Sequence, residues 1–68
     1  MKAAILAVGS ELLGPQRLDS NSLRLTTTLE RFGVELIGKS AVGDDEAAIA
    51  GELRHWMRGA DLVLVTGG

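Results

Sequence analysis

The residues from Ala3 to Val8, Ala-Ala-Ile-Leu-Ala-Val, form a continuous apolar run that stops at Gly9. A short run without polar alternation is typical of a strand that is buried on both faces of a parallel sheet. A second such run, Leu-Val-Leu-Val at residues 62–65, stands near the other end of the chain. The two runs predict two adjacent apolar strands around which the fold is built.

The segment between these runs contains two helical patterns and one more strand. We expect the first helix to begin at Asp19, a good N-cap residue, and to stop at Gly33. Its predicted buried stripe follows helical spacing and consists of Leu25, Leu29 and Phe32. The segment from Val34 to Val42 mixes polar residues and a glycine into its apolar pattern, which predicts a strand at the edge of the sheet.

We expect the second helix to begin with Asp44 as its N-cap and to end at Gly59. Asp45 and Glu46 place negative charge near the positive end of the helix dipole. The apolar residues that repeat at helical spacing, and that are therefore expected in the core, are Ile49, Leu53, Trp56 and Met57.

The element order is thus strand, helix, strand, helix, strand, and crossovers between parallel strands are right-handed almost without exception. This order predicts an α/β, three-layer fold with a mostly parallel sheet, the strand order 2-1-3, and helices on opposite faces. At 68 residues the chain is short for an α/β domain, and its last strand would keep an unpaired edge. We therefore expect residues 1–68 to be the amino-terminal part of a larger domain, which alone folds poorly or self-associates through that edge.

Composition argues against several functional classes. The net charge is −2 and no cluster of lysine or arginine offers a track for a phosphate backbone, so we expect no nucleic-acid partner. Residues 3–8 are too few to span a bilayer, and we expect no membrane association. The chain contains no cysteine, which fits a reducing compartment and leads us to expect a cytoplasmic location.

Ligands of an open α/β sheet bind beyond the carboxyl ends of the strands, and here each of those ends carries glycine beside a polar residue. Glycine lets a ligand approach the backbone closely, and free N–H groups at a helix start attract phosphate. Asp44 and Asp45 could hold a hard cation, although capping and the helix dipole alone would also explain them. Capping alone would likewise explain Asp19. Glu11 follows the first strand, where a solvated and a functional glutamate are equally open alternatives.

Familiar nucleotide motifs do not fit the sequence. Gly9 and Gly14 have the spacing of a P-loop, but Pro15 and Gln16 stand where Lys and Ser/Thr are required. The dinucleotide fingerprint fails because Gly9 is not followed by a second glycine two residues later. The single histidine, His55, is expected at the end of the second helix away from the cleft, so no Ser-His-Asp triad can be assembled.

Four segments, in order, resemble a known family: Ala-Val-Gly-Ser-Glu-Leu-Leu at 7–13, Asp-Ser-Asn-Ser at 19–22, Val-Gly-Asp-Asp at 42–45 and Asp-Leu-Val-Leu-Val-Thr-Gly-Gly at 61–68. The family is CinA (competence/damage-inducible), whose amino-terminal domain is similar to the wider molybdopterin-binding group of MoaB, MogA and the gephyrin G and E domains. This resemblance implies a three-layer α/β domain with divalent-metal-dependent ADP-ribose pyrophosphatase activity. Many CinA proteins add a carboxyl-terminal domain that deamidates nicotinamide mononucleotide, and nothing in this chain corresponds to it.

The resemblance also implies a set of site residues. The positions expected to bind substrate or phosphate are Gly9, Ser10, Asp19, Asn21, Gly43, Thr66, Gly67 and Gly68. Asp44 matches the aspartate that the molybdopterin-binding relatives place in their site. Gly67 and Gly68 match the start of a Gly-Gly-x-Gly-Pro-Thr segment, of which the rest and a following acidic pair are missing here. Residues 14–18 also depart from many relatives, whose glycine is placed differently.

Two functions follow from the resemblance. The first is hydrolysis of ADP-ribose or a similar nucleoside diphosphate sugar, with Mg²⁺ or Co²⁺ bridging the phosphate oxygens. Glu11 and Asp44 are then the catalytic candidates, and Asp44 and Asp45 the candidate metal ligands. The alternative is a domain that binds molybdopterin without hydrolysing it. We favour hydrolysis because residues 9–13 and 42–45 are closer to CinA than to MogA, and we expect a small nucleotide ligand and a homo-oligomer at full length.

Overall fold

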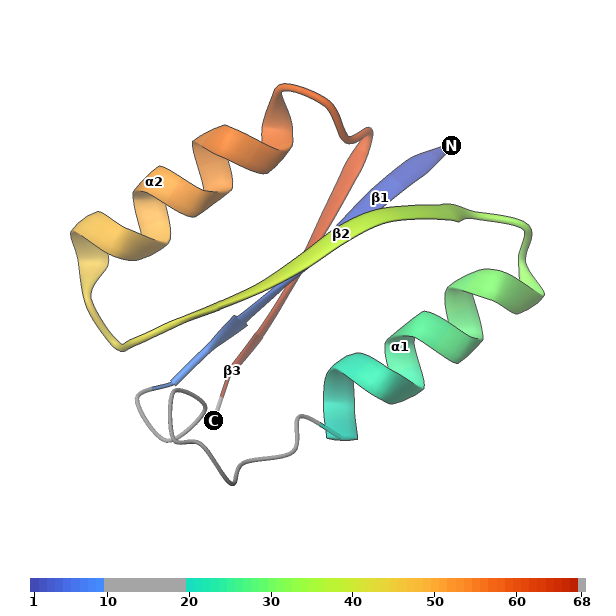
Figure 1. Cartoon of the computed structure of the whole chain (residues 1–68), viewed down its shortest axis with the longest axis horizontal. Coiled ribbons are helices and arrows are strands. Elements are labelled where there is room, and N and C mark those ends of the chain that lie inside the picture. Colours follow the sequence, from blue (N-terminus) through green and yellow to red (C-terminus); the bar gives the residue numbers. More distant parts are fainter. Residues whose placement is uncertain (10–19, 68) are drawn as a thin grey trace.

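The computed structural model describes residues 1–9 and 20–67 of the chain. The elements along the chain are β1 (Lys2–Val8), α1 (Ser20–Arg31), β2 (Glu35–Val42), α2 (Glu46–Met57) and β3 (Leu62–Gly67). This is the predicted alternation of strands and helices (Figure 1). Neither of the described helices is long and apolar enough to cross a membrane.

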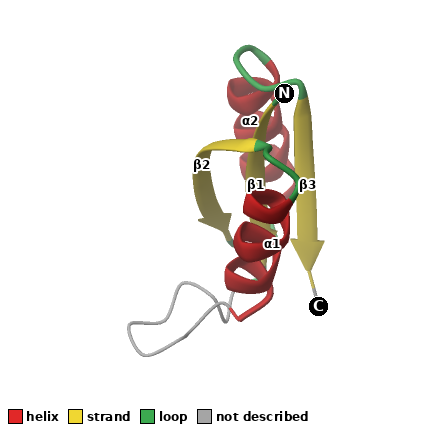
Figure 2. Ribbon diagram, turned by 90° about the vertical axis from the view of Figure 1, so that its right-hand side faces the viewer, coloured by secondary structure: helices red, strands yellow, loops and turns green. Residues whose placement is uncertain are grey.

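The three strands form one parallel sheet with the order β2-β1-β3. Both the α/β fold class and the strand order 2-1-3 are therefore confirmed. The sheet lies between α1 and α2, which cover opposite faces and complete the three layers (Figures 1 and 2). Because β1 has a neighbour on each side and a helix on each face, its residues from Ala3 to Ala7 are at most 1% exposed.

The hydrophobic core cluster that includes a helical residue lies on the α1 face of the sheet. Ala3 and Ile5 of β1 pack with Leu29 of α1, and the half-buried residues around them are Leu25, Val34, Leu36 and Leu64. Gly33, with a φ of +72°, ends the helical segment as predicted, because the left-handed conformation suits glycine. The prediction that Phe32 is buried is wrong, since its side chain is 78% exposed. The helix ends at Arg31, so helical periodicity no longer directs the residue that follows.

The start of α2 differs from the prediction by one residue. Asp45, not Asp44, is the N-cap: it has extended φ and ψ, and its carboxylate accepts a hydrogen bond from the amide of Ala48. The amide of Asp45 donates to the carbonyl of Gly43 at 2.8 Å, and this turn moves the helix start along by one position.

The predicted buried stripe of α2 is also only partly correct. No residue of α2 is fully buried, and Met57 is 67% exposed. Successive helical residues point about 100° apart, so a helix that directs Trp56 at the sheet carries Met57 to one side of it. Trp56 faces β2, where it contacts Gly38, and Met57 is therefore turned outward.

The edge strand β2 contains a register shift. Ala3 of β1 pairs with Leu36, but Ala4 pairs with Gly38, so Ile37 is an extra residue in β2. An extra residue of this kind is a β-bulge, and glycine within a strand often marks one. The shift brings Gly38 and Ser40 to the face of the sheet that α2 covers, as their contacts with Trp56 show.

Candidate functional site

The carboxyl ends of the three strands lie level with one another. Val8 of β1 is in register with Val42 of β2 on one side and with Gly67 of β3 on the other. The amide of Gly9 donates a hydrogen bond of 2.9 Å to the carbonyl of Val42, which continues the alignment past the end of β1. The predicted glycines therefore do come together at one edge of the sheet, which we call the carboxyl edge.

The glycines at this edge have different structural reasons for lacking a side chain. Gly9 is buried and has a φ of +153°, a conformation that L-residues rarely adopt, so the backbone itself favours glycine. Gly67 is exposed, and a Cβ added there would lie 3.4 Å from the carbonyl oxygen of Val8, an ordinary contact. No atom in the described part of the chain would clash with a side chain at Gly67, so packing does not explain the glycine. Its effect is to leave the backbone uncovered at the carboxyl edge.

Both helices begin at the carboxyl edge, but their charges differ (Figure 1). The first turn of α1 contains Asn21 and no acidic residue, whereas α2 has Glu46 in its first turn after the Asp45 cap. A helix N-terminus carries partial positive charge, which the carboxylates at α2 offset. The first turn of α1 itself therefore carries less negative charge than that of α2, while Asp19, directly before α1, lies outside the described residues.

One member of the predicted metal pair already has a structural role. Asp45 is an exposed residue whose Oδ2 accepts the amide of Ala48 at 3.3 Å, so capping explains this side chain. Asp44 is exposed beside it. Within residues 1–9 and 20–67, no group of three or more His, Cys, Asp or Glu side chains could hold a metal ion. The divalent metal stays a prediction.

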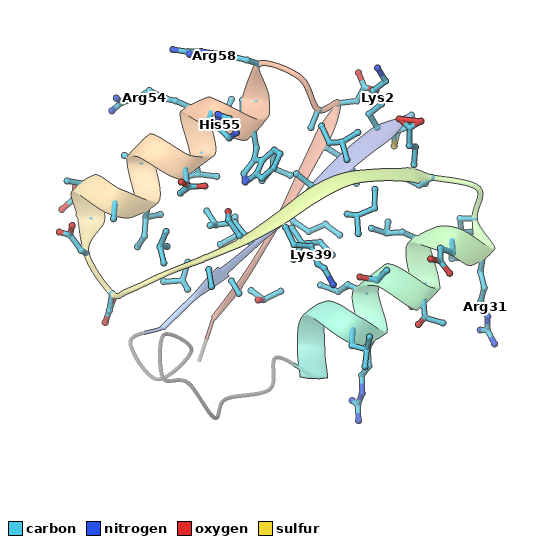
Figure 3. The ribbon with its side chains drawn as sticks, in the orientation of Figure 1. Lys2, Arg31, Lys39, Arg54, His55 and Arg58 are labelled. Atoms are coloured by element: carbon cyan, nitrogen blue, oxygen red, sulfur yellow. The ribbon has the colours of Figure 1, made fainter. Side chains whose placement is uncertain are left out.

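The structure places the other predicted site residues as follows. Thr66 is half-buried in β3, in register with Ala7, one residue before the edge. Gly43 follows the last residue of β2. Outside the described residues lie Ser10, Glu11, Asp19 and Gly68. His55 lies near the far end of α2, away from the carboxyl edge, where its ring packs edge-to-face on Trp56 with centroids 4.7 Å apart (Figure 3).

Sequence reasoning missed a hydrogen-bonded cluster behind the edge. The indole N–H of Trp56 donates to Ser40 Oγ at 2.8 Å, and the Ser40 hydroxyl donates to Glu52 Oε2 at 2.8 Å. Spacing placed Trp56 toward the sheet, and Ser40 was an unexplained polar residue in an edge strand. The partners depend on the bulge at Ile37, for which the neighbouring Gly38 was the only available sequence signal.

The family described as "probable molybdopterin binding domain" matches residues 4–68. The chain belongs to this family. The match runs from within β1 to residue 68 and includes all or most of every strand of the sheet.

Curated relatives support the resemblance to CinA. The chain is 47% identical to a CinA-like protein of Solibacter usitatus and 46% identical to one of Geobacter metallireducens, in each case over all 68 residues. Those residues are 16% of each relative, so the chain spans about one sixth of the length of the proteins that it matches. The predicted resemblance to the CinA family is confirmed.

A solved structure shares the fold. The molybdopterin biosynthesis moeA protein of Pyrococcus horikoshii superposes with a TM-score of 0.75 and 27% sequence identity. The superposition covers 94% of this chain and 19% of that protein. The arrangement of the strands and helices is therefore one that is also found within a larger protein of molybdopterin biosynthesis.

Proposed function

We propose that the carboxyl edge binds a small phosphorylated ligand of the molybdopterin type. The observation that carries this proposal is the level alignment of Val8, Val42 and Gly67, which brings Gly9, Gly43 and Gly67 to one edge in a chain of the molybdopterin-binding family. Exposed backbone at the ends of parallel strands is where open α/β sheets bind ligands. The name of the family and that of the moeA protein favour molybdopterin over other phosphorylated compounds.

The two helix starts support a ligand that carries a phosphate. Backbone N–H groups in the first turn of a helix have no partner within the helix and attract anions. The first turn of α1 contains no acidic residue, although Asp19 stands directly before it in the sequence. In our proposal the phosphate lies toward α1, and the polar pterin ring lies toward the turn at Gly43 and Asp44.

Titration of the full encoded protein with molybdopterin tests this proposal. We expect saturable binding that Asp44→Ala weakens about tenfold, the size of one lost hydrogen bond to a charged group. Glu35→Ala is the matched control, because Glu35 is also an exposed acidic residue but lies at the opposite, amino end of β2. Absence of saturable binding by the wild-type protein would remove the proposal.

The second candidate is hydrolysis of ADP-ribose by the whole protein. Full coverage of the chain by CinA-like relatives, and the sequence Val-Gly-Asp-Asp at 42–45, favour it. A divalent ion would supply charge stabilisation at the phosphates and a more acidic bound water. Among the described residues Asp44 and Asp45 could contribute carboxylates, with Asp45 already serving as the cap of α2. We place this candidate second because the descriptions of the family and of the moeA protein name molybdopterin.

Phosphate release from ADP-ribose, coupled to a phosphatase, distinguishes the two candidates. If the second is correct, the full protein with Mg²⁺ or Co²⁺ turns over ADP-ribose, and the Glu11→Ala, Asp44→Ala double variant does not. Turnover no higher than that of the double variant rules out hydrolysis. Binding of molybdopterin without such turnover would leave the first candidate alone.

A further inference from the structure

The polar cluster of Ser40, Glu52 and Trp56 joins the edge strand to the helix that follows it. All three residues are half-buried, and the two hydrogen bonds connect positions 12 and 16 residues apart in the sequence. Ser40 is the centre of the cluster, because its Oγ accepts from the indole of Trp56 and donates to the carboxylate of Glu52. A hydrogen bond to an ionised acceptor is stronger than one between neutral groups, and it constrains direction as well as distance.

The backbone of β2 is shaped to receive the indole ring. A Cβ added to Gly38 would lie only 2.2 Å from Cη2 and 2.8 Å from Cζ3 of Trp56. Any side chain at position 38 would therefore displace the ring from its place above the strand. Gly38 and Ser40 together define one position of Trp56 relative to β2, through close contact and through a hydrogen bond.

This cluster determines the orientation of α2 on the sheet. No residue of α2 is buried, so the helix has no fully enclosed apolar anchor of its own. Apolar contacts are not directional, whereas the hydrogen bonds of the cluster fix how α2 lies along β2. The turn that connects β2 to α2 contains Gly43, Asp44 and Asp45, all at the carboxyl edge. A change in the orientation of α2 along β2 would therefore move this turn relative to Gly9.

We propose that Ser40, Glu52 and Trp56 are positioning residues for the ligand site, since they hold the Gly43–Asp45 turn at the carboxyl edge. The inference rests on the proposed function for its ligand, but its structural part can be measured without one. The competing explanation is that the cluster only stabilises the fold. The two differ in what they predict for variants of equal stability.

Ser40→Ala removes both hydrogen bonds with little change in volume. In the full encoded protein we expect the dissociation constant for molybdopterin to rise about fivefold, within the range by which residues without ligand contact alter affinity. Ser40→Thr keeps the hydroxyl and should restore affinity to within about twofold of wild type. Val34→Ala is the control for stability alone. Val34 is half-buried in the core cluster on the α1 face and directly precedes β2, at the end of that strand away from the carboxyl edge. This substitution should lower stability without changing the dissociation constant.

Nuclear magnetic resonance of the protein without ligand gives an independent measurement. The amide of Ala48, which donates to the Asp45 carboxylate, reports on the turn. We expect Ser40→Ala to shift this amide resonance and to speed its hydrogen exchange, and Val34→Ala to leave its position unchanged. Wild-type affinity together with an unchanged Ala48 amide in Ser40→Ala would overturn the inference. If wild-type protein does not bind molybdopterin, the proposed function fails, and the Ala48 amide alone then decides whether the cluster positions the turn.

Discussion

The two helices are attached to the sheet in different ways. On the α1 face, Leu29 is 8% exposed and packs against Ala3 and Ile5 in an apolar core. On the α2 face no helical residue is buried, and half-buried Trp56 and Ser40 are joined by a hydrogen bond. Apolar burial supplies most of the free energy of folding but little direction, whereas hydrogen bonds supply less free energy and more direction. The helix α1 is therefore held mainly by apolar burial, whereas hydrogen bonds orient α2 and the acidic turn of the candidate site.

The same substitution in each helix tests this difference with the largest expected effect. Leu29→Ala should lower the free energy of unfolding by about 3 kcal/mol, because it removes a buried side chain and leaves a cavity. Leu53→Ala, at a half-buried position of α2, should cost about 1.5 kcal/mol. Urea denaturation followed by circular dichroism measures both. Equal losses would show that apolar packing holds the two helices alike, and the comparison would then be wrong.

A substitution at Gly38 should have the next largest effect. The methyl group of Gly38→Ala would displace the indole of Trp56 and break its hydrogen bond to Ser40, at a cost of about 2 kcal/mol. Trp56→Phe removes the ring atoms that the methyl group would meet, so the same glycine change should cost less in that background. A double-mutant cycle of the two substitutions measures this coupling by urea denaturation. Additive effects would contradict the close contact.

The main features of the fold could be predicted because they depend on local patterns. The apolar run at residues 3–8 and the polar edge strand predicted the order 2-1-3, and Gly33 supplied a helix stop whose φ of +72° the structure shows. The errors lie where a pattern meets an element boundary. Phe32 continues the helical spacing of α1 but stands after its last residue, and Met57 shares the last turn of α2 with Trp56. Neither boundary is set by hydrophobic periodicity.

The position of the candidate site could be predicted from the sequence, but its supporting side-chain contacts could not. The carboxyl ends of parallel strands share one edge, so the sequence placed Gly9, Gly43 and Gly67 together before the register was known. The cluster behind the edge could not be predicted in this way. Ser40 meets Trp56 only because the bulge at Ile37 shifts the register, and a shift of one residue in a strand exchanges its two faces.

The N-cap of α2 gives the smallest test of the comparison, and it separates two neighbouring residues. Asp45→Ala should cost about 1 kcal/mol, because the amide of Ala48 loses its acceptor. Asp44→Ala is the matched control, since it removes an equal charge one position earlier in the same turn and should cost less. Urea denaturation of both variants at neutral pH is the measurement.

A larger loss for Asp44→Ala would show that the carboxylate of Asp44 contributes more to stability at this turn than the cap at Asp45 does. The consequence would reach the site, because the carboxylate engaged with the helix would then be the one that the family resemblance assigns to the ligand. If Asp45→Ala instead costs more free energy of unfolding than Asp44→Ala, the two carboxylates have different roles. Asp45 fixes the start of α2, and the cluster around Ser40 fixes the orientation of that helix along β2. Both therefore determine the position of Asp44, which lies in the turn between β2 and α2 at the carboxyl edge.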